Sequence, residues 1–449
     1  MNVVAFPSQA ALYQPIGHFI RLGDSGYRKN AELHAQNLLK SKRFVVNASR
    51  ITYQREDIRM LREGGAEVVL DPRTVELGAL KYCGGDAAKA PWAVEDGSLL
   101  TAELRSPSHI FNLYGRIARC AVDHQIDAVL SPSGLVTGPS FKSQFDLDRN
   151  GCLAMRAALD ANGGKEIALD YLLVVRLTDL TDEKRRLELI AGLADLPFEN
   201  LWLRIATSSG TAGPLTAQRL IKVLSAIHNI GKPVILDYAG GLTGEALISM
   251  NVVSGLAHGI GRHGSFDVGG WDKPPRKPEP DEERQGGQAV RVDVPVFGRS
   301  FTIPEMETLL TARGAKALLV PTDKKILPNG PSDLRSDARR LNALEAERRI
   351  SAIEETPTVK RPEAFAEGRM KEAEQAARKA ARLNPNPKVA ADNKVDLDKM
   401  RARLSGNAGT IGKLRDVYAA QAEERQERGD IARSVSPPRH ATPFSETGS

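Results

Sequence analysis

Residues 201–238 read LWLRIATSSGTAGPLTAQRLIKVLSAIHNIGKPVILDY, which is two short apolar runs separated by a helix-like segment. The runs at 201–206 and 233–238 are almost continuously apolar, as is typical of parallel strands that are buried on both faces. Between them, apolar residues recur at helical spacing over 215–230, and Gly231 provides a helix stop. The stretch therefore predicts one strand–helix–strand unit.

The same unit repeats along the first 260 residues. Eight short apolar runs occur there, each followed by turn residues and, except for the last, by a helix-like segment. Eight units in about 250 residues match a (β/α)8 barrel, an α/β fold, and an open doubly wound sheet is the alternative. The predicted strands are His18–Leu22, Phe44–Ala48, Glu67–Asp71, Ala128–Ser131, Tyr171–Leu177, Leu201–Ala206, Pro233–Tyr238 and Val252–Ile260.

The chain changes character near Pro321. Before this point β-branched runs alternate with helix-like segments, and after it Ala, Arg, Glu and Lys replace the large apolar residues. We therefore expect a folded core followed by helical or flexible segments. The expected domains are a (β/α)8 barrel over 1–320 with insertions at 72–126 and 271–289, a docking helix within 321–360, and a charged flexible tail over 361–449.

One amphipathic helix is predicted directly after the barrel. It spans 332–356, is capped by Ser332, ends before Pro357, and carries apolar side chains broadly along one side. Aromatic residues are rare beyond it, and the last residues are low-complexity and polar, so most of the tail is expected to be disordered. Alanine and long charged side chains still favour solvated helices in parts such as 363–383 and 397–427.

Composition narrows the class of protein. Among 449 residues, 62 are Lys or Arg and 56 are Asp or Glu, which permits contact with nucleic acid but creates no strong field. Three cysteines are too few for a disulfide framework or a four-cysteine zinc site, so we expect a reducing cytoplasmic location. No run approaches the roughly 20 apolar residues that span a bilayer, and the N-terminus does not resemble a signal peptide, so no membrane partner is expected.

Polar residues cluster at the predicted strand ends. In a (β/α)8 barrel the active face lies at the C-terminal ends of the strands. Ionisable groups there are costly to bury unless they meet a ligand or one another, so the alternatives are a pocket or a salt-bridge network that only ties the barrel mouth together. That network would consist of Asp71, Asp237, Arg176 and Arg204. The polar residues at this face are Asp24, Asn47, Ser49, Asp71, Arg73, Ser131, Ser133, Arg176, Arg204, Asp237 and His258.

Three of these residues suit proton transfer. A histidine beside a carboxylate takes and returns a proton near neutral pH, so we predict that His258 works with Asp237 or Asp71. The chain has no HExxH motif, no metal-like Cys/His cluster, no Walker motif and no dinucleotide glycine fingerprint. The sequence therefore predicts no metal site and leaves the cofactor unknown.

Glycine-rich segments follow the last two predicted strands, at 239–245 and 259–265. Loops at this place in many barrels bind phosphate, because glycine lets backbone N–H groups approach an anion and a helix N-terminus favours negative charge. We expect a small phosphorylated or nucleotide-like ligand here, and the alternative is that the glycines only permit tight turns. The predicted ligand-binding residues are Asp24, Asn47, Arg176, Arg204, Gly241, Thr243, Gly261, Arg262 and Ser265.

Three fragments resemble parts of the tRNA-guanine transglycosylase barrels, a family that exchanges a base in tRNA. They are GDSGY at 23–27, GGLTGE at 240–245 and GRHG at 261–264, together 15 of the 449 residues. The resemblance implies that Asp24 contacts a base and that Gly241 lines the base pocket. His258 stands near the position of the family's nucleophilic aspartate, and the family's zinc-binding cysteines are absent.

Three functions follow as hypotheses. The first is a barrel enzyme that acts on a phosphorylated or nucleotide-like ligand by acid–base chemistry. The second is a transglycosylase-like protein that modifies a base in nucleic acid. The third is a catalytically silent barrel scaffold that recruits a protein partner through its C-terminal tail.

Overall fold

The computed structural model describes residues 12–23, 26–83, 85–206, 212–259, 266–274, 291–428 and 431–439. Eight parallel strands follow one another around a ring, which closes where β4 pairs with β6 and β9 pairs with β1. The predicted (β/α)8 barrel is confirmed, and the open sheet is wrong. The ring strands are β1 (Gly17–Arg21), β2 (Arg43–Asn47), β3 (Glu67–Asp71), β4 (Ala128–Leu130), β6 (Ala168–Arg176), β7 (Leu201–Ala206), β8 (Val234–Asp237) and β9 (Gly255–Gly259).

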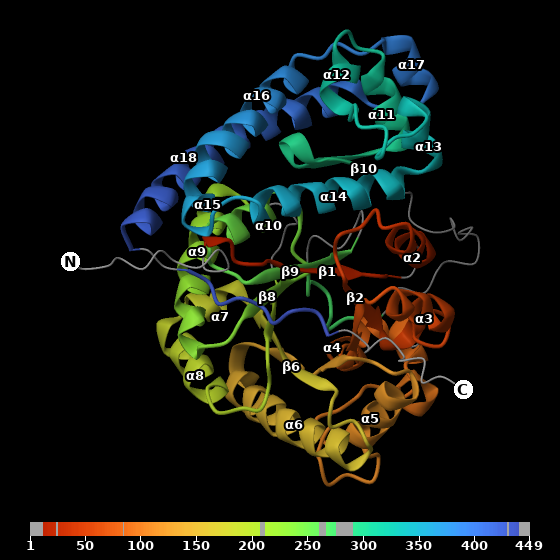
Figure 1. Cartoon of the computed structure of the whole chain (residues 1–449), viewed down its shortest axis with the longest axis vertical. Helices are drawn as coiled ribbons and strands as arrows, with labels where there is room; N and C mark the ends of the chain where they lie inside the picture. Colours follow the sequence, from red (N-terminus) through yellow and green to blue (C-terminus); the bar gives the residue numbers. More distant parts are fainter. Residues whose placement is uncertain are drawn as a thin grey trace, which may run out of the picture.

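Helices surround the ring of strands (Figure 1). The long segment after β3 holds one of them together with a four-residue helix and several single helical turns. A two-residue strand, β5 (Leu135–Val136), adds to one side of β6. The helices of this part are α2 (Tyr27–Ala35), α3 (Arg55–Glu63), α4 (Thr74–Leu77), α5 (Leu113–Asp123), α6 (Phe141–Ala161), α7 (Leu177–Thr181), α8 (Glu183–Leu193), α9 (Pro214–Ile227) and α10 (Gly241–Ser249).

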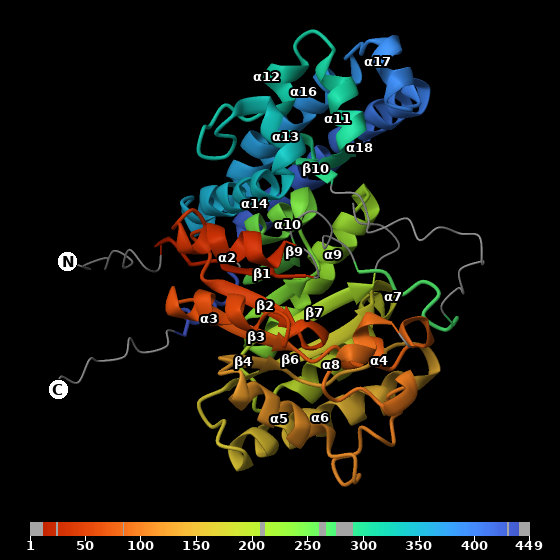
Figure 2. The same cartoon turned by 90° about the vertical axis from the view of Figure 1, so that its right-hand side faces the viewer.

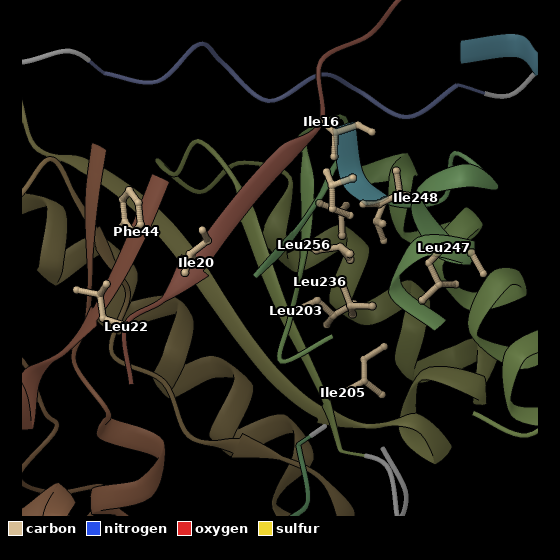
Figure 3. Packing of buried hydrophobic residues seen from close by; sticks show 14 of the residues in the cluster. Ile16, Ile20, Leu22, Phe44, Leu203, Ile205, Leu236, Leu247, Ile248 and Leu256 are labelled. Atoms are coloured by element: carbon tan, nitrogen blue, oxygen red, sulfur yellow. The ribbon is translucent and has the colours of Figure 1, made fainter. Parts of the chain in front are cut away.

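Each strand buries side chains on both faces, which is why its sequence is continuously apolar. Residues that point outward, such as Ile20 and Leu236, join the cluster between strands and helices shown in Figure 3. Residues that point inward fill the barrel, where the ring of Trp202 meets the ring of Phe19 edge-on at 4.7 Å. The barrel interior is therefore a packed core over most of its height.

A buried carboxyl group lies in this interior. Asp170 of β6 accepts hydrogen bonds from Trp202 Nε1 at 2.7 Å and from Asn200 Nδ2 at 3.0 Å. Burial raises the pKa of Asp170 to about 7.

We expect Asp170 to lower the stability of the fold as pH rises from about 4 to about 7. Over this interval an unfolded aspartate has released its proton while the folded one retains it, so the unfolded state binds fewer protons and is favoured by rising pH. Urea unfolding of the wild type and Asp170→Asn across this range measures the effect. In Asp170→Asn, the free energy of unfolding should fall less steeply with rising pH than in the wild type. The same dependence on pH in both proteins would contradict the prediction.

Residues 291–428 build a second unit beside the barrel (Figure 2). It contains an antiparallel hairpin that the sequence did not reveal, bound through Asn342, which donates to Arg291 O at 2.8 Å and accepts from Asp293 N at 2.9 Å. Its elements are β10 (Arg291–Val294), β11 (Arg299–Thr302), α11 (Ile303–Leu310), α12 (Ala315–Leu319), α13 (Asp333–Ser336), α14 (Ala338–Glu354), α15 (Arg361–Glu363), a π-helical segment (Ala364–Arg369), α16 (Met370–Ala381), α17 (Pro387–Asp392) and α18 (Leu397–Arg428).

The docking helix differs from its predicted form. A break at Asp337, whose φ is −142°, separates α13 from α14, and the side chain of Asp337 rather than that of Ser332 caps the longer helix. Helix α14 then packs along the barrel near α2 and α10. Within the described ranges, no helix is both long enough and apolar enough to cross a bilayer.

The charged tail is packed rather than solvated over 361–428. Helices form close to where they were predicted, but Phe365, Met370 and Tyr418 are 3%, 0% and 1% exposed. Most of the other buried positions on α16 are alanines, whose small side chains give little apolar signal in a sequence rich in Arg, Lys and Glu. Residues 440–449 lie outside the described part of the chain.

Candidate functional site

Four strands bring a cluster of charged side chains together at the C-terminal end of the barrel, which we call the mouth. Arg21 of β1 donates through Nε and Nη2 to the two carboxylate oxygens of Asp237, each at 2.6 Å, and through Nη1 to Asp71 Oδ2 at 2.9 Å. Arg204 of β7 donates through Nε to Asp237 Oδ2 at 2.6 Å and through Nη2 to Asp71 Oδ2 at 2.5 Å. Each of the two carboxylates therefore bridges both arginines.

The cluster is charged although it is buried. Burial by itself favours a neutral carboxyl group, but Arg204 and Arg21 hold the pKa of Asp71 well below its usual range. Burial likewise disfavours the charge of Arg21, yet Asp237 keeps the pKa of this guanidinium above its ordinary value. The four ion pairs between Arg21 or Arg204 and Asp71 or Asp237 are thus retained at neutral pH.

A further ion pair extends the cluster. Arg73 Nε lies 3.0 Å from Glu76 Oε1, and Arg204 Nη1 lies 3.8 Å from the same oxygen. The three positive charges of Arg21, Arg73 and Arg204 balance the three negative charges of Asp71, Asp237 and Glu76. Among the described residues, Arg204 Nη1 and Glu76 Oε2 are buried without a hydrogen-bond partner. Arg73 Nε and Trp271 Nε1 are also buried without a hydrogen-bond partner. The described part of the mouth therefore holds several unused donors and the unused acceptor Glu76 Oε2.

Aromatic rings lie against these charges. The ring of Tyr238 stands over the guanidinium groups of Arg21 at 4.3 Å and Arg204 at 5.1 Å. Consecutive ring centres 5.4 to 5.5 Å apart continue the row from Tyr238 through Phe266 and Trp271 to Tyr82. Trp271 meets both Phe266 and Tyr82 edge-on, so the row combines apolar ring faces in different planes with cation–π contacts.

The backbone at the mouth is strained in two places. Arg73 and Tyr238 have φ values of +57° and +56°, a left-handed conformation that non-glycine residues rarely adopt. Their N–H groups donate to Asp71 Oδ1 and Asp237 Oδ1, each at 2.9 Å. Strain of this kind is concentrated at functional sites.

His258 is not part of this cluster. Strand pairing places Ala257 beside Asp237, so the next residue along β9, His258, points to the outer face of the barrel. There its Nε2 lies 3.1 Å from His18 Nε2, and His18 Nδ1 lies 3.3 Å from Glu347 Oε2 of α14. The structure brings Asp71 and Asp237 together but separates them from His258.

The other predicted ligand-binding residues have different outcomes. Asn47 joins the cluster, since its Oδ1 accepts from Arg21 Nη1 at 3.3 Å. Arg176 does not join it, because its side chain is exposed at the end of β6. Gly241 begins α10 with a φ of +58°, and Thr243 Oγ1 accepts from Ala212 N at 3.4 Å. The residues that lie outside the described part of the chain are Asp24, Gly261, Arg262 and Ser265.

Sequence reasoning missed two members of the cluster. Arg21 lies within the run HFIRL, and strand periodicity from Phe19 would have pointed it into the barrel. Glu76 lies in the four-residue helix α4, within a segment assigned to an insertion, and no pattern in the sequence indicates its place.

Within the described residues, no group of three or more His, Cys, Asp or Glu side chains is arranged to hold a metal ion. No family model matches the chain, and no curated protein matches it.

Proposed function

We propose that the protein is a barrel enzyme that binds a nucleotide-like ligand at the mouth. The observation that supports this most is the pair of unused polar atoms, Arg204 Nη1 and Glu76 Oε2, buried beside the aromatic row. Leaving such groups unsatisfied costs about 1–3 kcal/mol each, so a ligand edge that carries both an acceptor and a donor would recover this energy. A nucleobase has such an edge, and its flat face stacks on aromatic side chains.

The N-terminus of α10 supports a phosphorylated ligand. This nine-residue helix starts at Gly241, directly beyond the mouth end of β8, and its N-cap residue, Gly240, has no side chain that could cap it. The N–H groups of an uncapped first turn, together with the helix dipole, favour an anion. A phosphate attached to the base-like part is the proposed occupant.

Glu76 is the proposed proton acceptor. Arg21 and Arg204 engage both oxygens of Asp237 and Oδ2 of Asp71, and the Arg73 N–H engages Asp71 Oδ1, so these two carboxylates orient the guanidinium groups. Glu76 has an oxygen that no described side chain engages. A carboxylate within reach of a ligand N–H group is suited to general base catalysis.

Modification of a base in nucleic acid is the alternative, since the same aromatic row suits a base that is still attached to a strand. In the fragments that resemble the transglycosylases, Glu245 of α10 pairs with Arg369 at 2.7 Å. This alternative adds salt-sensitive RNA or DNA binding to the ligand binding proposed here. A scaffold that uses its C-terminal helices would instead bind a protein and no nucleotide.

Glu76→Gln is expected to weaken the binding of a nucleoside monophosphate by roughly 10-fold or more, because a hydrogen bond to a charged group contributes about 1.5–3 kcal/mol. Isothermal titration calorimetry measures the change, and the melting temperature reports any loss of folding. Glu56→Gln is the matched control, since the Glu56 side chain is 77% exposed on α3. Equal affinities in the two variants would contradict the role given to Glu76.

A further inference from the structure

The end of the described chain lies across the barrel on the side opposite the mouth. Residues 431–439 follow α18 as an extended segment and cross the strands in Figure 1 as a dark blue trace. Their contacts include Glu67 and Arg43, the first residues of β3 and β2. We call this segment the latch and the N-terminal end of the barrel the floor.

An apolar socket in the floor receives Val435. This side chain is 5% exposed and belongs to the same interior cluster as Phe19 and Ile235. Gly17, the first residue of β1, leaves room for it, because a Cβ atom at position 17 would lie 2.8 Å from Val435 Cγ2. The Val435 side chain thus fills the space that Gly17 leaves open.

Charged groups hold the latch beyond the socket. The backbone N–H of Arg439 donates to Glu67 Oε2 at 3.2 Å. The Arg439 guanidinium group lies with its Nη1 3.4 Å from Glu67 Oε1 and also pairs with Glu199. Arg43 pairs with Glu67 at 3.3 Å and donates to the carbonyl oxygen of Ser436. Glu67 and Glu199 are thus the carboxylates that pair with the Arg439 side chain.

The latch sequence suits binding in an extended form. Pro437 and Pro438 lie between the two anchors, Val435 and Arg439. Proline fixes φ near −65° and has no N–H group, so this stretch loses little conformational entropy and leaves few donors unsatisfied when it binds. Two side chains, Val435 and Arg439, anchor the segment, and the backbone of Ser436 and Arg439 adds single hydrogen bonds to side chains of the floor. The described latch residues add no strand to the sheet.

We propose that the floor is a recognition site for an extended peptide of the form Val-Ser-Pro-Pro-Arg, which the chain fills with its own residues 435–439. Occupation in cis ties the end of α18 to the barrel and closes the interior on this side. The socket selects a small β-branched side chain, and the carboxylates of Glu67 and Glu199 select the arginine.

Full-length Val435→Asp tests the site, because a carboxylate is strongly disfavoured in the apolar socket and the latch should leave it. A fluorescent peptide with the sequence of residues 431–439 should then bind this variant saturably, as followed by fluorescence anisotropy. It should bind the wild type at least 10-fold more weakly, because the tethered latch competes at a local concentration in the millimolar range. A peptide in which the arginine is replaced by glutamate should bind the variant at least 10-fold more weakly than the unmodified peptide. Equal binding of both peptides, or no binding to a folded variant, would overturn the proposal.

A second pair of variants probes the socket without a buried charge. Gly17→Ala should displace Val435 and speed tryptic cleavage after Arg433 in the full-length chain, whereas Val435→Ala in the same protein removes the colliding atom and should slow that cleavage again. Circular dichroism verifies that all variants stay folded. Cleavage rates that change independently at the two positions would show that Val435 does not occupy the space beside Gly17.

Discussion

Asp237→Ala is expected to lower the free energy of unfolding by about 3–5 kcal/mol, the range measured when one partner of a buried ion pair is removed. Asp237 accepts three hydrogen bonds from the buried guanidinium groups of Arg21 and Arg204. Without it, Arg21 keeps its ion pair with Asp71, and Arg204 keeps its ion pair with Asp71 and the longer one with Glu76. Urea unfolding monitored by circular dichroism measures the loss.

Arg176→Ala is the control for this substitution. The two residues both end strands of the barrel, but the Arg176 side chain is exposed, so its removal should change the free energy of unfolding by no more than about 0.5 kcal/mol. A loss below about 1 kcal/mol for Asp237→Ala would show that the cluster is not a buried ion network of the strength inferred here.

Trp202→Ala should also cost about 3–5 kcal/mol, because it leaves a large cavity in the barrel interior. The side chain is 0% exposed, touches Phe19 edge-on and donates its Nε1–H to Asp170. Trp202→Phe keeps much of the ring volume and removes the hydrogen bond, so its loss should be smaller. If the two variants were equally destabilised, the hydrogen bond to Asp170, and not the packing of the ring, would account for the effect.

The barrel could be predicted from the sequence because its strands are buried on both faces. The run at 233–238, for example, differs from β8 by one residue at each end. Helices that are buried through small side chains show no comparable run of large apolar residues in the sequence. Ala373 and Ala377 are 0% and 1% exposed, yet their segment has the composition of a solvated tail.

The candidate site could be predicted only in part, because a strand residue faces inward or outward according to its register. Composition and strand ends were enough to place Asp71, Asp237 and Arg204 in one network. A shift of one residue along β9 moves a side chain from the interior to the outer face, which is why His258 lies against His18 rather than against Asp237. The contribution of Glu76 depends on the path of the chain after β3, which periodicity does not encode.

Calorimetric titration of the full-length protein with nucleoside monophosphates tests the proposed function most directly, with the free bases and inorganic phosphate as separate arms. We predict saturable binding of at least one nucleotide, weaker binding of its base and of phosphate alone, and a loss of affinity in Glu76→Gln. Val435→Asp, on the opposite side of the barrel, should leave this binding unchanged. The absence of binding by every nucleotide and base at millimolar concentration, or an affinity that Glu76→Gln does not alter, would contradict a nucleotide site at the barrel mouth.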